Sequence, residues 1–174
     1  MLDVVKIWEA ARATSAATTF FDSITINDET FVDGATGANN PIAYLWTEAG
    51  DVWGGGNGLF EADIKCVVSI GTGIPSLTAF GPDLIQVGKA LKAISIDTEE
   101  TADSFQKQHT KLFQEGKAFR FNVTKGLENI GLEDTSKWKE IKAATRLYIQ
   151  TEDTFVRLKK CALNLQEREC MLFT

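Results

Sequence analysis

The sequence has 174 residues, of which 44% are hydrophobic and 24% are charged, and its formal net charge is −6 at pH 7. This length suits one domain with a hydrophobic core, and the composition is that of a folded globular protein. The acidic balance argues against a nucleic-acid-binding module, which needs clustered Lys and Arg, and no apolar run reaches the roughly 18 residues that span a bilayer.

The first third of the chain predicts a helix, a β-hairpin and a second helix. Apolar side chains at Val4, Ile7, Trp8 and Ala11 repeat with helical spacing. In chain order, the predicted elements are a helix over 3–13, strands at 24–26 and 30–32, a small-residue loop over 33–40, and a helix from Pro41 through Ala49.

The rest of the chain alternates strand and helix patterns. The apolar, β-branched run 64–70 ends at Gly71-Thr72-Gly73, which is typical of a buried parallel strand. Residues 118–123 alternate with period two, as an edge or half-exposed strand does. The remaining predicted elements are a flexible loop at 54–58, helices over 83–96 and 98–114, and one broken or two separate helices over 136–168. This order predicts an α/β domain with covered sheet faces.

Cysteine and histidine counts restrict the chemistry further. The three cysteines (Cys66, Cys161 and Cys170) form no Cys-x-x-Cys pair, which argues against a disulfide framework and a zinc site. The single histidine, His109, lies among polar residues and is expected to be a solvated surface residue. We therefore expect no metal and no cofactor. Because the N-terminus lacks a secretory signal pattern, we expect a cytoplasmic protein.

Asp33-Gly34-Ala35, directly after a short predicted strand, is the sharpest local motif. A carboxylate at a strand end, followed by a glycine that can take a positive φ, is held on a tight turn and can act as a general base. Asp-Gly is also a common turn pair, so the tripeptide by itself favours a plain turn. No Gly-x-Ser-x-Gly elbow occurs in the chain, and Ser15 is expected to be a packing or helix-end residue.

Four strings together resemble the patatin-like phospholipases. They are 7–21, which resembles the helix and loop before the family's catalytic aspartate, Asp33-Gly34-Ala35 with the strand before it, Gly37 to Pro41, and Val68 to Gly73. The resemblance is strongest over 7–73, and 74–174 is similar to the family's C-terminal helices and one strand. It implies a three-layer α/β/α domain, of which residues 1–174 are the C-terminal portion.

The resemblance also implies a mechanism. The family works with a Ser-Asp dyad and without histidine, so Asp33 corresponds to the general base and Gly34 supports its turn. Asn39 and Asn40 correspond to residues that hold the loop. The implied partners are a phospholipid or neutral lipid ester as substrate and a membrane surface as a peripheral contact, with no nucleic acid. By resemblance, a glycine-rich loop of backbone N–H groups stabilises the oxyanion.

The family's serine elbow and oxyanion loop lie upstream of the matching segment, and neither is present in these residues. A dyad aspartate without its serine cannot perform covalent catalysis. The sequence therefore predicts a fragment of a lipid acyl hydrolase that supplies Asp33. One alternative is a catalytically dead remnant that acts as a lipid-binding or protein-interaction module. Another is an unrelated α/β protein in which Asp33-Gly34-Ala35 is merely a turn.

Overall fold

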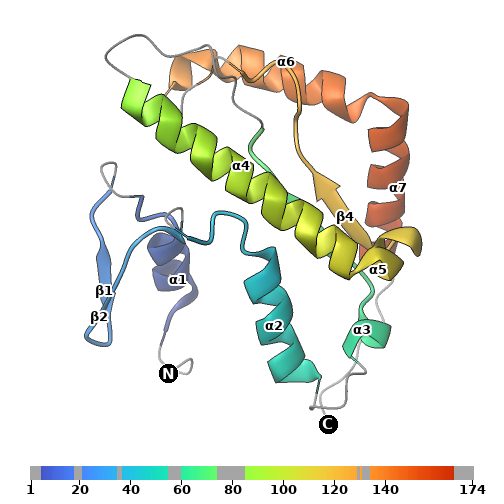
Figure 1. Ribbon diagram of the computed structural model, residues 1–174, viewed down its shortest axis with the longest axis horizontal. Helices are drawn as coiled ribbons and strands as arrows, with labels where there is room; N and C mark the ends of the chain where they lie inside the picture. Colours follow the sequence, from blue (N-terminus) through green and yellow to red (C-terminus); the bar gives the residue numbers. More distant parts are fainter. Residues whose placement is uncertain are drawn as a thin grey trace. The chain divides into compact units, whose positions relative to one another are not determined.

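The computed structural model of the chain divides it into two compact units, Met1–Pro41 and Ile42–Thr174, which are described separately (Figure 1). The residues that the structure describes are 5–17, 21–34, 37–54, 60–73, 85–128, 130 and 134–166, with the side chains of the longest helix described from Asp97 onward.

The first unit holds a helix and a hairpin, as predicted. Helix α1 (Ile7–Thr14) begins where the Glu9 carboxylate accepts the Lys6 backbone N–H at 2.8 Å, and it ends at Ser15. Strands β1 (Ile24–Ile26) and β2 (Glu29–Phe31) pair antiparallel. Asn27 and Asp28 join them with φ of 50° and 66°, the left-handed pair that a two-residue hairpin turn requires.

The second unit alternates helices and strands. Its elements are α2 (Ile42–Trp53), α3 (Phe60–Asp63), β3 (Val67–Ile70), α4 (Ile85–Gln108), α5 (Thr110–Gln114), β4 (Ala118–Phe121), a 3₁₀ turn η4 (Thr135–Lys137), α6 (Trp138–Ile149) and α7 (Glu152–Gln166). The predicted helix start at Thr98 is wrong, because α4 runs through it and the break falls at His109. No glycine or proline near Thr98 stops the helix, so it continues. The predicted loop at 54–58 lies largely outside the described residues.

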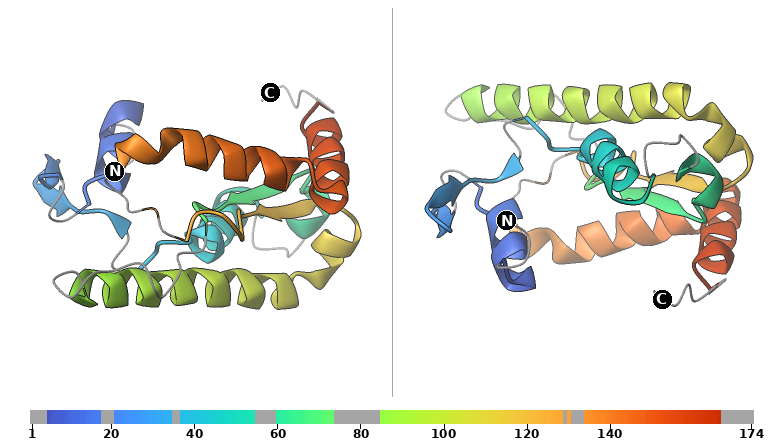
Figure 2. Two further views of the ribbon diagram at one scale, coloured as in Figure 1. Left: turned by 90° about the horizontal axis from the view of Figure 1, so that it is seen from above. Right: turned by 90° about the horizontal axis from the view of Figure 1, so that it is seen from below.

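Strands β3 and β4 are parallel, with Val67 opposite Ala118 and Ile70 opposite Phe121. Helices α4 and α6 lie on opposite sides of this strand pair (Figure 2). Among the described residues β4 pairs with β3 alone, so it is an edge strand as expected for 118–123, but it is not half-exposed, because Ala118, Phe119 and Phe121 are buried. The period-two alternation indicated that one face of the strand is exposed to solvent. Instead, α5 and α7 both contact this strand. Strand β3 is only half-buried, and Ile70 at its end is exposed.

The core of the second unit lies on the side of the strands that α6 and α7 cover. Phe119 and Phe121 of β4 point to this side and surround the buried Cys161 of α7. Half-buried side chains of β3, α6 and α7 surround this cluster, among them Val68, Tyr148 and Leu158. The apolar positions on alternate residues of β4 therefore anchor the C-terminal helices to the sheet.

Replacement of Gly50 by alanine is expected to stabilise the protein by about 0.5 to 1 kcal/mol, because glycine inside α2 costs backbone entropy. The added Cβ would lie 3.9 Å from Phe60 Cδ1, which is an ordinary van der Waals contact. At Gly54, four residues on, a Cβ would lie 2.4 Å from the Gly50 carbonyl oxygen. Gly54→Ala should therefore destabilise the protein. Urea unfolding of both variants tests this contrast, and shifts of the same sign would contradict it.

Candidate functional site

Asp33 follows β2 closely, so the strand end carries the carboxylate as the sequence predicts. Its backbone N–H donates to the carbonyl oxygen of Ala16 at 3.0 Å, and Ala16 is 1% exposed. Beyond it, the Gly37 and Ala38 N–H groups both donate to the Gly34 carbonyl, at 3.0 and 2.6 Å. The bond to the buried Ala16 and the two bonds to the Gly34 carbonyl hold the backbone on either side of the half-buried Asp33.

Gly34 differs from its prediction. Its φ is not positive, and a Cβ there would meet only the Ala38 Cβ, at 3.6 Å. At Gly34 the backbone therefore does not use glycine's conformational freedom. Ala35 lies outside the described residues.

The two asparagines expected to hold the loop differ in environment. Asn40 is buried at 6% exposure, whereas Asn39 is exposed. A buried amide is usually hydrogen-bonded. The burial of Asn40 therefore fits the loop-holding role predicted for it, and the exposure of Asn39 fits that role less well. Ser15 ends α1, and its Oγ donates to the Ala11 carbonyl at 2.9 Å. The expectation that Ser15 is a helix-end residue is confirmed.

A second polar group lies at the carboxyl ends of β3 and β4, where sequence reasoning had placed only a turn. Arg120 donates through Nη1 to Ser69 Oγ and through Nη2 to Glu99 Oε1, both at 2.9 Å. Asn122, buried just beyond β4, donates through Nδ2 to the same Glu99 oxygen at 2.9 Å. The Asn122 side-chain oxygen accepts the Gly73 N–H at 2.8 Å. These contacts join α4 to both strand ends.

The network also explains the glycines after β3. A Cβ at Gly71 would lie 2.4 Å from Asn122 Oδ1 and 2.8 Å from Arg120 Nη2. Gly73 has a φ of +106°, a conformation that strains any other residue. The only sequence signal for this network was an arginine within an otherwise apolar strand, followed closely by an asparagine.

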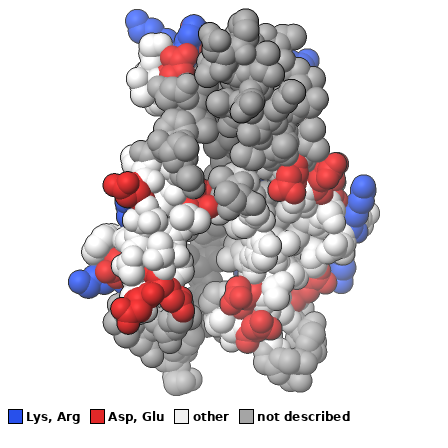
Figure 3. Space-filling model, turned by 60° about the vertical axis from the view of Figure 1, so that its left-hand side comes forward, with Lys and Arg blue, Asp and Glu red and all other residues white. Residues whose placement is uncertain are grey.

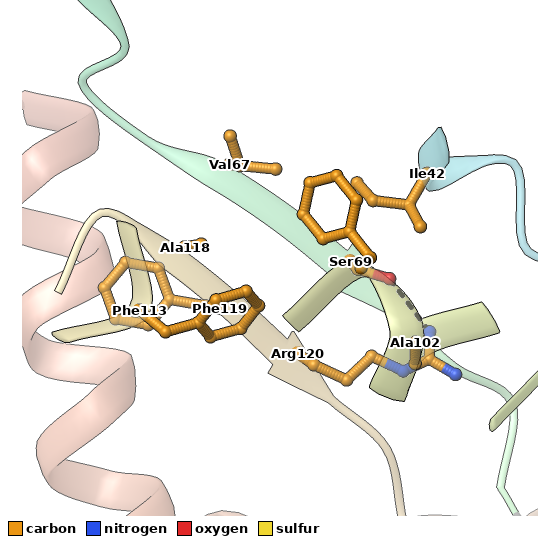
Figure 4. Close-up of a pocket in the computed structure, with 9 residues that line it drawn as sticks. Ile42, Val67, Ser69, Ala102, Phe113, Ala118, Phe119 and Arg120 are labelled. Carbon is orange, nitrogen blue, oxygen red and sulfur yellow. Dashed lines mark hydrogen bonds between the residues drawn. The ribbon is translucent and has the colours of Figure 1, made fainter. Parts of the chain in front are cut away.

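A small pocket lies between the strand pair and α4. Figure 4 shows Val67 and Ile42 on one side and the Arg120 guanidinium reaching toward Ser69 on the other. The lining is otherwise apolar: Ile42, Val67, Ala102, Phe105, Phe113, Ala118 and Phe119. Arg120 Nη1 donates to Ser69 Oγ inside the pocket, whereas the buried Arg120 Nε has no hydrogen-bond partner among the described residues.

His109 is not the solvated residue that its polar neighbours indicated. Its ring lies 4.3 Å from the Trp46 ring and 4.5 Å from the Phe105 ring, measured between centroids. Its Nδ1 lies 2.9 Å from Glu61 Oε1, and its side chain is 16% exposed. The expectation failed because Trp46 and Glu61 come from α2 and α3, which no local pattern around His109 can reveal.

His109→Ala is expected to lower the free energy of unfolding by about 2 to 3 kcal/mol, because it removes two ring contacts and leaves Glu61 without this partner. His109→Phe keeps a ring and should lose less. Urea unfolding of the two variants measures the difference. If His109→Ala has the same unfolding midpoint as the unmutated chain, the contacts of His109 with Trp46, Phe105 and Glu61 contribute nothing to stability.

Within the described residues, no group of three or more His, Cys, Asp and Glu side chains could hold a metal ion. No helix in the described part of the chain is long and apolar enough to cross a membrane. On the face that Figure 3 shows, acidic side chains are spread over the described surface and basic ones lie toward its margins, rather than in one patch.

Comparisons with known proteins relate this chain to one group of enzymes. Residues 1–46, which include Asp33, match the family model described as patatin-like phospholipase. Phospholipase A I of Arabidopsis thaliana is 30% identical over 152 residues, which is 84% of this chain and 11% of that protein. Calcium-independent phospholipase A2-gamma of Oryctolagus cuniculus is 26% identical over 174 residues, which is 96% of this chain and 20% of that protein.

The human calcium-independent phospholipase A2-gamma is 34% identical over 68 residues, which is 39% of this chain and 8% of that protein. No solved structure matches the chain significantly. The chain spans about a tenth to a fifth of the length of the first two relatives. These matches confirm the resemblance found in the sequence: the chain is a relative of the patatin-like phospholipases.

Proposed function

We propose that this chain is part of a lipid acyl hydrolase and supplies Asp33 as the general base of a Ser-Asp dyad. The observation that carries the proposal is the position of Asp33. It lies at a strand end, inside the segment that matches the family model, with its backbone N–H fixed on a buried carbonyl. A base held in this way does not need to reorganise when the proton transfer occurs.

In the proposed reaction the serine oxygen attacks the carbonyl carbon of a lipid ester while Asp33 accepts the serine proton. Asp33 then gives that proton to the departing alcohol oxygen, which leaves an acyl-serine. A water molecule attacks the acyl group, again with Asp33 as base, and releases the fatty acid and the free serine. Backbone N–H groups of a glycine-rich loop stabilise the oxyanion in both steps.

The serine and the oxyanion loop have to come from sequence outside these 174 residues, since no Gly-x-Ser-x-Gly occurs within them. We propose that both parts build one three-layer α/β/α domain, of which this chain is the C-terminal portion. The placement of α4 and α6 on opposite sides of β3 and β4 supports that arrangement (Figure 2).

Both relatives are named as phospholipases, and the second is named as calcium-independent. We propose that the substrate is a phospholipid ester, which the protein reaches from the cytoplasmic side by peripheral contact with a membrane. The chemistry requires no metal, because the aspartate and the backbone N–H groups supply both proton transfer and charge stabilisation.

The test uses the protein as encoded in full, with any sequence that flanks these residues, and phosphatidylcholine vesicles containing EDTA. Fatty-acid release should proceed in the presence of the chelator. The 174-residue chain by itself should release none. If the full protein binds vesicles but releases no fatty acid, the proposal fails and the lipid-binding alternative replaces it. If the flanking sequence contains no Gly-x-Ser-x-Gly, the dyad is excluded.

A further inference from the structure

Two cysteines that are 95 positions apart in the sequence come together in the second unit. Cys66 lies just before β3, and Cys161 lies on α7. Their Sγ atoms are 3.9 Å apart, and both residues carry free thiols. Cys161 is buried at 5% exposure against Phe119 and Phe121, whereas Cys66 is half-buried at the border of the same cluster.

We propose that Cys66 and Cys161 form an oxidation site, at which a small disulfide compound converts the two thiols into an intramolecular disulfide bond. The sulfur atoms of a disulfide are about 2.05 Å apart. They therefore have to approach each other by roughly 2 Å, which is on the scale of a side-chain rotation. This inference concerns the fold of the second unit and does not depend on the proposed hydrolase activity.

The reaction is a double thiol–disulfide exchange. The more accessible Cys66 loses its proton, attacks one sulfur of the small disulfide RSSR and releases one thiolate RS⁻. Cys161, from within the core, then loses its proton and attacks Cys66 Sγ, which releases the second RS⁻ as the internal S–S bond forms. The two thiolates take up the two protons. The protein loses two electrons, and RSSR becomes two RSH.

The environment of the pair sets the speed of this reaction. Burial, together with the neighbouring Cys161, raises the pKa of Cys66 to about 11. Only the thiolate attacks, and a higher pKa means a smaller thiolate fraction at neutral pH. The pair should therefore stay reduced during brief exposure to an oxidant at pH 7. Its rate of oxidation should rise about tenfold for each pH unit until the pH approaches 11.

A disulfide at this position would tie the start of β3 to α7 and close a loop that contains α4, α5, β4 and α6. A cross-link over so long a loop restricts the unfolded chain strongly. We expect the oxidised protein to melt about 5 to 10 °C higher than the reduced protein. Addition of a dithiol reductant should restore the original melting temperature.

The test treats the complete 174-residue chain with oxidised glutathione at pH 7, 8 and 9 and digests it with trypsin without reductant. Cleavage after Lys and Arg puts the three cysteines on different peptides, 66–89, 161–168 and 169–174. The expected product is a cross-link between 66–89 and 161–168, accompanied by the rise in melting temperature. Its rate should increase about tenfold from pH 8 to pH 9.

Two variants serve as controls. Cys170→Ala should form the same cross-link at the same rate, because Cys170 takes no part. In Cys161→Ala, peptide 66–89 should keep a glutathione adduct on Cys66, independently of any adduct that Cys170 forms on peptide 169–174. A cross-link that involves 169–174 would overturn the proposal. So would the absence of any link between 66–89 and 161–168 in the unmutated chain after Cys66 has reacted with glutathione.

Discussion

Replacement of Asp33 by asparagine is expected to lower fatty-acid release by at least about a thousandfold in the protein as encoded in full. Asparagine has nearly the same shape but cannot accept the serine proton. The hydrogen bond from residue 33 to Ala16 uses only backbone atoms and should survive, so the fold should be retained. The measurement is the initial rate on phosphatidylcholine vesicles, beside a thermal unfolding curve of each protein.

Asp28→Asn is the matched control, because it makes the same chemical change in the same unit. Asp28 lies in the hairpin turn with a φ of 66°, a conformation that asparagine tolerates well. We expect this control to keep both its activity and its stability. Undiminished activity in Asp33→Asn would remove Asp33 from the mechanism, and an equal loss in both variants would point to damage to the unit rather than to the chemistry.

Gly71→Ala is expected to lower the free energy of unfolding by about 2 to 3 kcal/mol. The added Cβ would lie 2.4 Å from Asn122 Oδ1, so Asn122 has to shift. That shift would break the bonds from Asn122 to Glu99 and from the Gly73 N–H to Asn122. The loss would leave buried polar atoms unpaired, and urea denaturation followed by circular dichroism measures it.

Gly37→Ala is the matched control for this prediction. No atom lies within 4 Å of a Cβ built at Gly37, and its φ is not positive. Its unfolding midpoint should therefore stay close to that of the unmutated chain. In the Asn122→Ala background, the cost of Gly71→Ala should shrink but not vanish, because the Asn122 side-chain atoms at 2.4 and 2.6 Å are gone while Arg120 Nη2 at 2.8 Å remains. An unchanged cost in that background would show that another contact causes the loss.

The sequence was sufficient wherever the signal was local. Hairpin strands around Asn27 and Asp28, a helix after Pro41 and a strand before Gly71 follow from side-chain periodicity and turn residues, which act over a few positions. The same local information placed Asp33 directly after a strand. It also carried the family resemblance, because the strings that match lie close together in the chain.

Local patterns were misleading where a distant segment decides the environment. Polar neighbours indicated a solvated His109, yet Trp46 and Glu61 cover it from other helices. Alternation indicated a half-exposed strand at 118–123, yet helices cover the strand and three of the four residues of β4 are buried. In both cases burial depends on which elements pack together, and periodicity within one element carries no information about that.

By itself, the sequence determined the composition of the chain, the order of its elements, its relation to the patatin-like phospholipases and the position of Asp33 at a strand end. Only the tertiary structure brought Arg120 to Glu99 and Cys66 to within 3.9 Å of Cys161. The physical reason is the distance along the chain over which each kind of interaction acts. Backbone preferences act between near neighbours, whereas these contacts form only when parallel strands and their covering helices are already packed together.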